Sequence, residues 1–239
     1  MPVGFRVYLE INRHNRDTVS AVSSFSTASL TDAMNGFNLI ESSIRPLHNQ
    51  WSPWAGTAIT VDVTPGDGLM IRKAIDTAKP GDVLVVNAHG CRERAVLGGS
   101  VAIDMLKRGV LALVVDGAVR DVEEMKALEF PVFARNAVAR SGTTESGWGE
   151  VNLPIACGGV VVFPGDVVVA DSGGLLVVPA PDVTEVSNRA AEIEKKKGRP
   201  EDIQQRLQDR KWPNPGSLRA DRAISERGGS VVSGCYRRG

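Results

Sequence analysis

The first half of the chain alternates between strand-like and helix-like patterns of apolar residues. Residues 56–63 alternate between apolar and polar side chains, which predicts a half-buried strand. Residues 69–78 and 101–108 carry apolar side chains at helical spacing, so each predicts a helix with one buried face. The continuous apolar run 110–115 predicts a central strand that is buried on both sides.

Shorter patterns extend this alternation along the rest of the chain. Ser26 is a candidate helix cap and Gly36 a candidate helix end within the predicted helix 20–40. Asp116 and Gly117 predict a turn directly after the central strand. The other predicted elements are a strand at 83–86, a helix at 121–128, a strand at 132–134 and three β-rich runs between 160 and 178. Helices and strands in alternation, followed mostly by strands, predict an α/β layered sandwich.

The last part of the chain differs in composition. Asp182 and Glu185 resemble a capping box that begins a helix through Lys197, and Gly198 and Pro200 end it. Residues 199–239 combine prolines, glycines and many arginines. We therefore expect one domain at 1–198 and an irregular extension at 199–239, which is either disordered or wraps a neighbouring subunit.

Composition and charge narrow the classes of function. Lys plus Arg and Asp plus Glu each number 28 among the 239 residues, so no net charge attracts nucleic acid or an anionic membrane. No apolar run reaches the about 20 residues of a membrane-spanning helix, and the start of the chain lacks a signal-peptide core. Three widely spaced cysteines predict neither a disulfide framework nor a zinc site. We expect a cytoplasmic protein without nucleic-acid or membrane partners.

Two loops carry candidate chemistry, and the first is rich in glycine. Gly98, Gly99 and Ser100 open the predicted helix that continues from Val101. Glycines allow several backbone N–H groups to approach one point, and a helix N-terminus favours an anion. The alternative is an ordinary turn before a helix.

The second loop follows the predicted central strand and contains Arg120 and Asp121 side by side. Ligands of α/β proteins bind at the carboxyl ends of such strands. Arg120 would hold a carboxylate or enolate oxygen of a small oxo-acid, and Asp121 would ligate a hard divalent cation. The alternative is that Asp121 caps the following helix while Arg120 forms a surface ion pair.

The two loops are separated by one predicted helix and one predicted strand, so we expect them at the same edge of the sheet. Anion-binding amides, a carboxylate and a guanidinium would then converge. Such a constellation suits an anionic oxo-acid whose enolate must be stabilised.

These motifs resemble the RraA-like family, which includes metal-dependent aldolases and a ribonuclease regulator. The aldolase members share a glycine, twenty residues, Arg-Asp, two residues and an acid, and the matching positions here are Gly99, Arg120, Asp121 and Glu124. The resemblance runs from about residue 20 to about residue 195 and includes Pro80-Gly81-Asp82 and Pro164-Gly165-Asp166. It implies an α/β/β sandwich of the swivelling β/β/α type, assembled as a homotrimer or homohexamer with sites between subunits.

The resemblance also implies a role for each matching residue. Arg120 would bind the pyruvyl group and stabilise its enolate, and Asp121 would hold Mg²⁺ or Mn²⁺. The amides of Gly98, Gly99, Ser100 and Val101 would bind the substrate carboxylate, and Glu192 or Glu194 would serve a neighbouring subunit's site. Some aldolase members carry Asp where this chain has Gly99, and that Asp positions a proton-shuttling water. Its absence here puts proton transfer in question.

The implied function is a class II aldolase that cleaves a 4-hydroxy-2-oxo acid to pyruvate and decarboxylates oxaloacetate as a side activity. Candidate substrates are 4-hydroxy-4-methyl-2-oxoglutarate and 4-carboxy-4-hydroxy-2-oxoadipate. The main alternative is a non-catalytic regulator that binds and inhibits a ribonuclease. That family member departs from Arg-Asp at the metal position, whereas this chain retains Asp121.

The sequence supports three other enzyme hypotheses less well than a metal-dependent aldolase. A Schiff-base aldolase needs a buried lysine, and the candidates Lys73, Lys79, Lys107 and Lys126 occupy predicted solvent-facing positions. A Cys91 nucleophile with His89 as its base lacks an orienting acid. A methyltransferase function needs a nucleotide-binding pattern of strand, glycine-rich loop and acid, which the sequence does not contain.

Overall fold

The computed structural model describes the chain except residues 1, 144–146, 198–202, 212–213 and 230–239. The chain divides into two compact units, Met1–Glu194 and Lys195–Gly239. The first unit contains every strand among the described residues and the candidate site.

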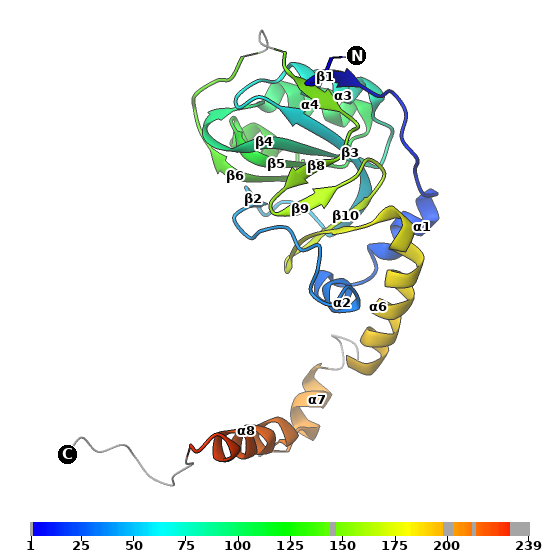
Figure 1. Cartoon of the computed structure of the whole chain (residues 1–239), viewed down its shortest axis with the longest axis vertical. Coiled ribbons are helices and arrows are strands. Elements are labelled where there is room, and N and C mark those ends of the chain that lie inside the picture. Colours follow the sequence, from blue (N-terminus) through cyan, green and yellow to red (C-terminus); the bar gives the residue numbers. More distant parts are fainter. Residues whose placement is uncertain (1, 144–146, 198–202, 212–213, 230–239) are drawn as a thin grey trace, which may run out of the picture. The chain divides into compact units, whose positions relative to one another are not determined.

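A parallel sheet forms the centre of the first unit (Figure 1). Its order is β3 (Trp54–Val63), β4 (Asp82–Ala95), β5 (Ala112–Val119) and β6 (Val132–Ala137), and each neighbouring pair is parallel. The carboxyl ends of all four strands therefore meet at one edge of the sheet. The short antiparallel β2 (Arg45–Pro46) borders β6.

The outer side of β3 is shared by two antiparallel strands. Its carboxyl end pairs with β7 (Gly149–Val151), which also pairs with β1 (Phe5–Val7), and its amino end pairs with β10 (Val167–Asp171). β11 (Gly174–Val178) completes a hairpin with β10. The three β-rich runs predicted between 160 and 178 are thus confirmed as β9 (Val160–Val162), β10 and β11.

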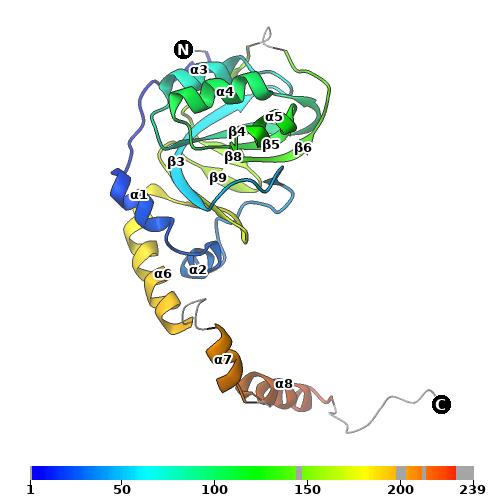
Figure 2. The ribbon, with the colours of Figure 1, turned by 180° about the vertical axis from the view of Figure 1, so that it is seen from behind.

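Three helices cover one face of the parallel sheet (Figure 2). They are α3 (Leu69–Thr77), α4 (Gly99–Arg108) and α5 (Val122–Ala127). Their apolar stripes pack against the side chains of alternate strand positions to form one core, which includes Ile71, Met105, Met125, Ile59 and Leu113. Each of these five side chains is fully buried.

The opposite face of the sheet packs against further strands. β8 (Ile155–Cys157), β9 and the β10–β11 hairpin enclose a second core with Val83, Val85 and Val114. The far side of the β10–β11 hairpin is covered by α1 (Arg16–Val22), α2 (Thr27–Ala33) and α6 (Val183–Lys197). Helices, central sheet and a second β layer confirm the predicted α/β/β sandwich.

The helix predicted at 20–40 is wrong in its extent, because the segment forms two short helices. α1 ends at Val22 and α2 begins at Thr27. The Ser26 hydroxyl accepts a hydrogen bond from the Ser29 amide at 3.1 Å, which caps α2 at its first turn. The predicted cap at Ser26 is confirmed, and it starts a new helix rather than lying inside one.

The turn predicted at Asp116 and Gly117 is also wrong. β5 continues through both residues to Val119, and all of its residues are buried. The strand predicted at 83–86 is the beginning of the longer β4, which remains paired with β5 across two register shifts. His89 and Gly90 adopt positive φ angles of 53° and 69° within this irregular stretch. Because bulges break the two-residue period, the sequence pattern did not indicate the extension.

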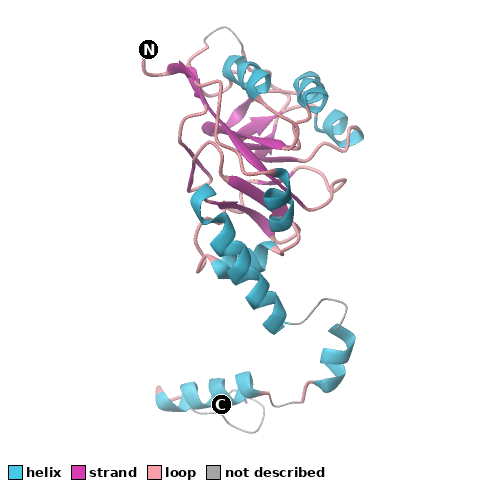
Figure 3. Ribbon diagram, turned by 90° about the vertical axis from the view of Figure 1, so that its right-hand side faces the viewer, coloured by secondary structure: helices cyan, strands magenta, loops and turns pink. Residues whose placement is uncertain are grey.

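The second unit contains helices where an irregular extension was predicted (Figure 3). α7 (Ile203–Asp209) and α8 (Pro215–Glu226) are both helical, and Asn214 caps α8. No residue of either helix is buried. Gly198 and Pro200, predicted to end α6, lie outside the described residues, as does Cys235. No helix among the described residues is long and apolar enough to cross a membrane.

Candidate functional site

Three hydrogen bonds join the two candidate loops at the carboxyl end of β5. The Val96 amide donates to the Ala118 carbonyl at 2.9 Å, and the Arg120 amide donates to the Leu97 carbonyl at 3.1 Å. The Gly99 amide donates to Asp121 Oδ2 at 3.2 Å. The expectation that the glycine loop and the Arg-Asp loop lie at the same edge is therefore confirmed.

Arg120 and Asp121 form an ion pair with each other. Arg120 Nε lies 3.2 Å from Asp121 Oδ2, and both side chains are more than a third exposed. Asp121 occupies the N-cap position of α5 with a φ of 56°, but its side chain makes no capping hydrogen bond. The helix-cap alternative is thus wrong: the Asp121 carboxylate turns toward Arg120 and the glycine loop.

The two glycines leave room for these side chains. A Cβ at Gly98 would stand 2.9 Å from Arg120 Cγ and would overlap Asp121 Oδ2. A Cβ at Gly99 would overlap Glu124 Oε2 and stand 2.9 Å from Glu124 Cβ. The Glu124 carboxylate therefore occupies the space into which a side chain at position 99 would project.

A cavity of about 310 Å³ opens beside Arg120. Its lining comes from segments that follow the carboxyl ends of β3, β4, β5 and β6, where ligands of parallel α/β sheets bind. The lining residues are Gly68, Arg72, Ala95, Val96, Leu97, Val101, Arg120, Ser141, Gly142 and Thr143.

Several lining residues were missing from the sequence-based site. Arg72 lies in α3, and Ser141 to Thr143 follow β6. Two backbone hydrogen bonds join these segments: the Gly68 amide donates to the Thr143 carbonyl at 2.9 Å, and the Thr143 amide donates to the Gly66 carbonyl at 2.7 Å. The sequence indicated that α3 follows a parallel strand, but no local pattern singled out Arg72 among its residues.

Two of the amides expected to bind a carboxylate already have partners. The Gly99 amide donates to Asp121, and the Val101 amide donates to the Gly98 carbonyl at 3.1 Å. These two amides of the first turn of α4 therefore already donate hydrogen bonds within the protein. Of the expected loop residues, Val101 lines the cavity together with Arg120.

Asp121 is the carboxylate of the site best suited to a divalent cation. Mg²⁺ is commonly held by one or two carboxylates while waters or substrate oxygens complete its shell. Asp121 is partly exposed and pairs with the cavity-lining Arg120 but does not itself line the cavity, and Glu124 approaches the adjacent Gly99. Among the described residues, no cluster of three or more His, Cys, Asp or Glu side chains could hold a metal by itself. The donors therefore fit a cation that shares its shell with substrate or water.

The two glutamates proposed for a neighbouring subunit lie on α6, away from the cavity lining. Glu194 Oε1 accepts a hydrogen bond from the Ser26 amide at 2.9 Å and so supports the start of α2. Glu192 is exposed on the same helix. Within its own chain neither residue lines the cavity.

The lysines and the His89–Cys91 pair do not meet the requirements of the alternative mechanisms. Lys73 is half-exposed and pairs with Asp76 at 3.1 Å, and Lys126 pairs with Glu123 at 3.7 Å. None of the four candidate lysines lines the cavity. His89 Nε2 lies 2.8 Å from Asp62 Oδ1, so the expectation that no acid accompanies His89 is wrong. Neither His89 nor Cys91 lines the cavity, however.

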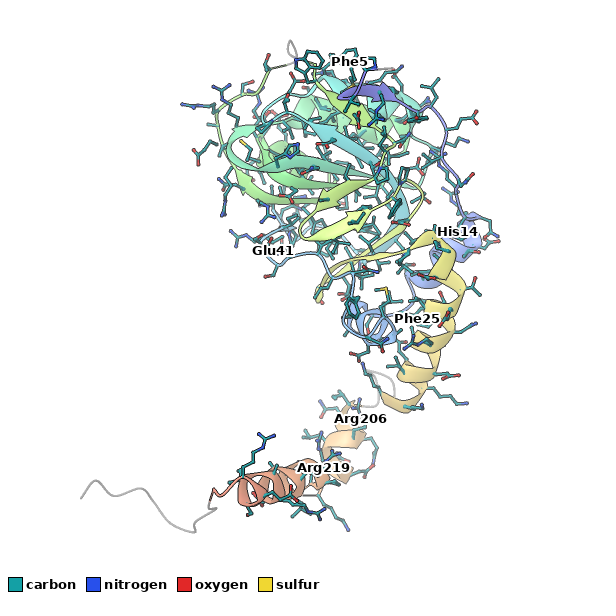
Figure 4. The ribbon with its side chains drawn as sticks, viewed as in Figure 1. Phe5, His14, Phe25, Glu41, Arg206 and Arg219 are labelled. Carbon is teal, nitrogen blue, oxygen red and sulfur yellow. The ribbon has the colours of Figure 1, made fainter. Side chains whose placement is uncertain are left out.

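A separate ionic network supports the sheet behind the site. Arg135 on β6 binds Asp116 on β5 and also Glu41, which is labelled in Figure 4. The Gly158 amide donates to Asp116 Oδ2 at 2.8 Å. Burial alone would raise the pKa of Asp116, but the hydrogen bonds from Arg135 and Gly158 outweigh it, so the pKa lies below its usual range. Burial raises the pKa of the neighbouring Cys157 thiol, so this cysteine is a packing residue.

Two relatives in the comparison with known proteins carry the same aldolase name. A protein of Halalkalibacterium halodurans, provisionally named a 4-hydroxy-4-methyl-2-oxoglutarate aldolase, is 39% identical over 163 residues, which cover 68% of this chain and 77% of the relative. The 4-hydroxy-4-methyl-2-oxoglutarate aldolase of Thermus thermophilus is 37% identical over 115 residues, covering 48% of this chain and 70% of the relative.

Solved structures show the same fold. Streptomyces coelicolor RraAS2, described as an unusual member of the RNase ES inhibitor RraA protein family, matches with a TM-score of 0.69 and 25% identity. The match covers 79% of this chain and 97% of that chain. The family model described as RraA-like, Aldolase/RraA, matches residues 27–177. This range contains the glycine loop, Arg120 and Asp121, and the chain belongs to the RraA-like family.

Proposed function

We propose that this chain is a divalent-metal-dependent aldolase that cleaves a 4-hydroxy-2-oxo acid and releases pyruvate. One observation carries the proposal: Arg120 and Asp121 lie against the glycine loop beside a cavity at the carboxyl ends of the parallel strands. A guanidinium next to a carboxylate that can hold a cation is the arrangement needed to stabilise a pyruvate enolate. The names of the relatives support the same class of reaction.

The reaction breaks the C3–C4 bond of the substrate. The C4 hydroxyl loses its proton and becomes a carbonyl, and the bonding electron pair passes to C3 to form pyruvate enolate. Protonation of C3 then gives pyruvate. Arg120 binds the pyruvyl carboxylate or enolate oxygen, and Asp121 would hold Mg²⁺ or Mn²⁺, which supplies Lewis-acid stabilisation of the enolate charge. Oxaloacetate decarboxylation passes through the same enolate and is the expected side activity.

Proton transfer in this chain is assigned to Glu124. Gly99 has no side chain, and the Glu124 carboxylate fills the space next to it. An acid at this place could position the water that exchanges protons with the substrate. A carboxylate from a neighbouring subunit of a trimer or hexamer would complete the site, and we favour Glu192, because Glu194 already supports α2.

The test is a pyruvate-release assay coupled to lactate dehydrogenase, with 4-hydroxy-4-methyl-2-oxoglutarate and with 4-carboxy-4-hydroxy-2-oxoadipate. We expect activity with Mg²⁺ or Mn²⁺, its loss with EDTA and its return when the metal is restored. Arg120→Ala should lower kcat by about 10²- to 10³-fold, because it removes a charge that stabilises the transition state.

Two results would contradict this proposal. Full activity in EDTA together with trapping by borohydride and pyruvate would indicate a Schiff-base mechanism. Turnover of Arg120→Ala close to that of the unmodified chain would remove Arg120 from the mechanism.

The second candidate function is that of a regulator that binds a ribonuclease. The similar structure from Streptomyces coelicolor supports it, because that protein is described as a member of an RNase ES inhibitor family. Arg120, Asp121 and the cavity favour the enzyme, because a binding-only protein has no need of an enolate-stabilising site. Absence of pyruvate release with either metal, together with inhibition of a ribonuclease, would reverse this choice.

A further inference from the structure

The cavity contains a second arginine that the proposed reaction does not use. Arg72 lies in the first turn of α3 and lines the same cavity as Arg120, but the two residues come from different elements. Among the described residues of the lining, Arg72 and Arg120 are the only charged side chains, and none is a carboxylate. The described lining therefore carries two positive charges and no negative charge.

Arg72 is available to a ligand. Its single ion-pair partner among the described residues is Asp104 on α4, at 3.9 Å, and both side chains are about half-exposed. Such an exposed pair at the limit of contact contributes about 0–1 kcal/mol, so a ligand anion can replace it at little cost. By contrast, Arg120 already contacts Asp121 at 3.2 Å and is oriented by it.

The surroundings of Arg72 also suit a carboxylate. Gly68 precedes the first residue of α3 and lines the cavity. The neighbouring Asp67 is buried and does not line the cavity, and its carboxylate accepts hydrogen bonds from the Leu69 and Gly147 amides. Ser141 and Thr143 line the same cavity, and the Ser141 hydroxyl donates a hydrogen bond to the Gly142 carbonyl at 3.1 Å. A volume of about 310 Å³ accommodates a five- to seven-carbon acid, near the lower end of the range for small-molecule pockets.

We infer that Arg72 binds a second carboxylate of the substrate, at the end opposite to the pyruvyl group held by Arg120, and so selects dicarboxylic over monocarboxylic oxo-acids. This inference rests on the proposed function. Arg72 is a specificity-determining residue: it contributes to the binding of the second anionic group and takes no part in breaking the C3–C4 bond. The charge-assisted contact would be lost with any substrate in which that carboxylate is replaced by a methyl group.

Binding of inert probes tests the inference independently of turnover. The probes are 2-oxoglutarate and 2-oxopentanoate, which have the same carbon chain but carry a carboxylate and a methyl group, respectively, at the far end. Calorimetry in Mg²⁺ should show 2-oxoglutarate binding to the full chain at least about 10-fold more tightly. Arg72→Gln should reduce this preference to less than about 3-fold, and Arg72→Lys should restore part of it.

Lys73→Gln is the matched control, because Lys73 is the next residue of the same helix, carries the same charge and does not line the cavity. It should leave the preference unchanged. The inference is overturned if the unmodified chain shows no preference, if Arg72→Gln retains it, or if Lys73→Gln removes it equally. None of these outcomes depends on catalysis.

A kinetic arm separates this inference from the proposed function. 4-Hydroxy-4-methyl-2-oxoglutarate and 4-hydroxy-4-methyl-2-oxopentanoate differ by one carboxylate in place of a methyl group. Arg72→Gln should lower kcat/KM for the first by about 10- to 100-fold, mainly through KM, and change the second by less than about 3-fold. Deuterium exchange into the methyl group of pyruvate should be unchanged. Equal losses for both substrates would overturn the inference and leave the aldolase proposal intact. A lack of cleavage and exchange by the unmodified chain would instead overturn the aldolase proposal, and the calorimetric comparison would then show only whether Arg72 binds a second carboxylate.

Discussion

The positions of the site side chains depend on the atoms packed against them more than on the helix-capping or backbone preferences of the residue types. Asp121 is held at a positive φ of 56° and still does not cap the helix that follows it. The Gly99 amide and Arg120 instead hold its carboxylate in place. A side chain at Gly98 would occupy the space of both Arg120 and Asp121, so the glycine is needed for the geometry of the ion pair rather than for an unusual backbone angle.

The Asp116–Arg135 pair makes a pH-dependent contribution to stability. Both side chains are largely buried, at 10% and 16% exposure, and the pKa of Asp116 is lowered in the folded protein. A lowered pKa means that the contribution is present above the unfolded value of about 3.9 and is lost as the pH falls through the folded value.

Asp116→Asn should therefore destabilise the protein by about 3 kcal/mol at pH 7, because it leaves a largely buried guanidinium with Glu41 as its only remaining carboxylate among the described residues. The difference in unfolding free energy between the two proteins should shrink below about pH 4, because Asp116 of the unfolded chain takes up a proton there while the lowered pKa keeps Asp116 of the folded protein ionised to lower pH. Urea titrations at pH 7, 5 and 3.5 measure this difference. A difference that stays constant over this range would show that the charge of Asp116 is not responsible.

At the level of helices and strands, the parallel sheet creates the site. Helices α3 and α4 each begin at the carboxyl edge of the sheet, and the loop after β5 carries Arg120 and Asp121. The apolar sides of the helices anchor them in one core, while their first turns project side chains into the cavity. The packing of α4 thus connects the stability of the core to the position of the glycine loop.

Met105 tests how tightly α4 packs in the core, because its side chain is fully buried on the core side of the helix. Met105→Ala should lower the free energy of unfolding by about 2–5 kcal/mol through the loss of buried surface and the cavity it leaves. Met105→Leu keeps most of the volume and should cost less than about 1.5 kcal/mol. Denaturant unfolding monitored by circular dichroism distinguishes the two, and equal effects of both variants would argue against tight packing at this position.

For the chain as a whole, the division into two units has a direct consequence for stability. The described residues of α7 and α8 are all accessible, including the apolar side chains of Ile203, Leu207, Leu218 and Ile224. The core clusters all lie within the first unit. The described helices of the extension therefore bury none of their apolar side chains in a single chain.

A chain that stops after Lys197 should keep the melting temperature of the full chain to within about 2 °C, because surface segments without buried contacts contribute little to unfolding free energy. Differential scanning calorimetry of both forms makes the comparison, and light scattering reports the mass of each assembly. A fall of more than about 5 °C accompanied by a smaller mass would show that the extension stabilises the protein through a neighbouring subunit.

The local elements of this protein were readable because their signals are short-range. The apolar period of residues 69–78 and the continuous apolar run 110–115 correspond to α3 and to the first half of β5, since burial on one face or on both faces dictates those patterns. The adjacency of the two loops could also be predicted, because one helix and one strand must return the chain to the same edge. The sequence did not predict the separation of α1 from α2, because the turn that ends in the Ser26 cap leaves the hydrophobic pattern nearly unchanged. It did not predict the full length of β4, because two bulges interrupt the alternation of apolar and polar residues.

What the sequence by itself determined is the alternation of helices and strands around the central parallel sheet, the family and the pairing of a glycine loop with Arg120 and Asp121. Tertiary structure alone brought Arg72 and the residues after β6 to the same cavity, because these segments are distant along the chain and meet only where four parallel strands end side by side. It also decided that the Glu124 carboxylate occupies the space beside Gly99. Side-chain periodicity reports which face of an element is buried, whereas the neighbours of an exposed charge depend on how distant elements pack.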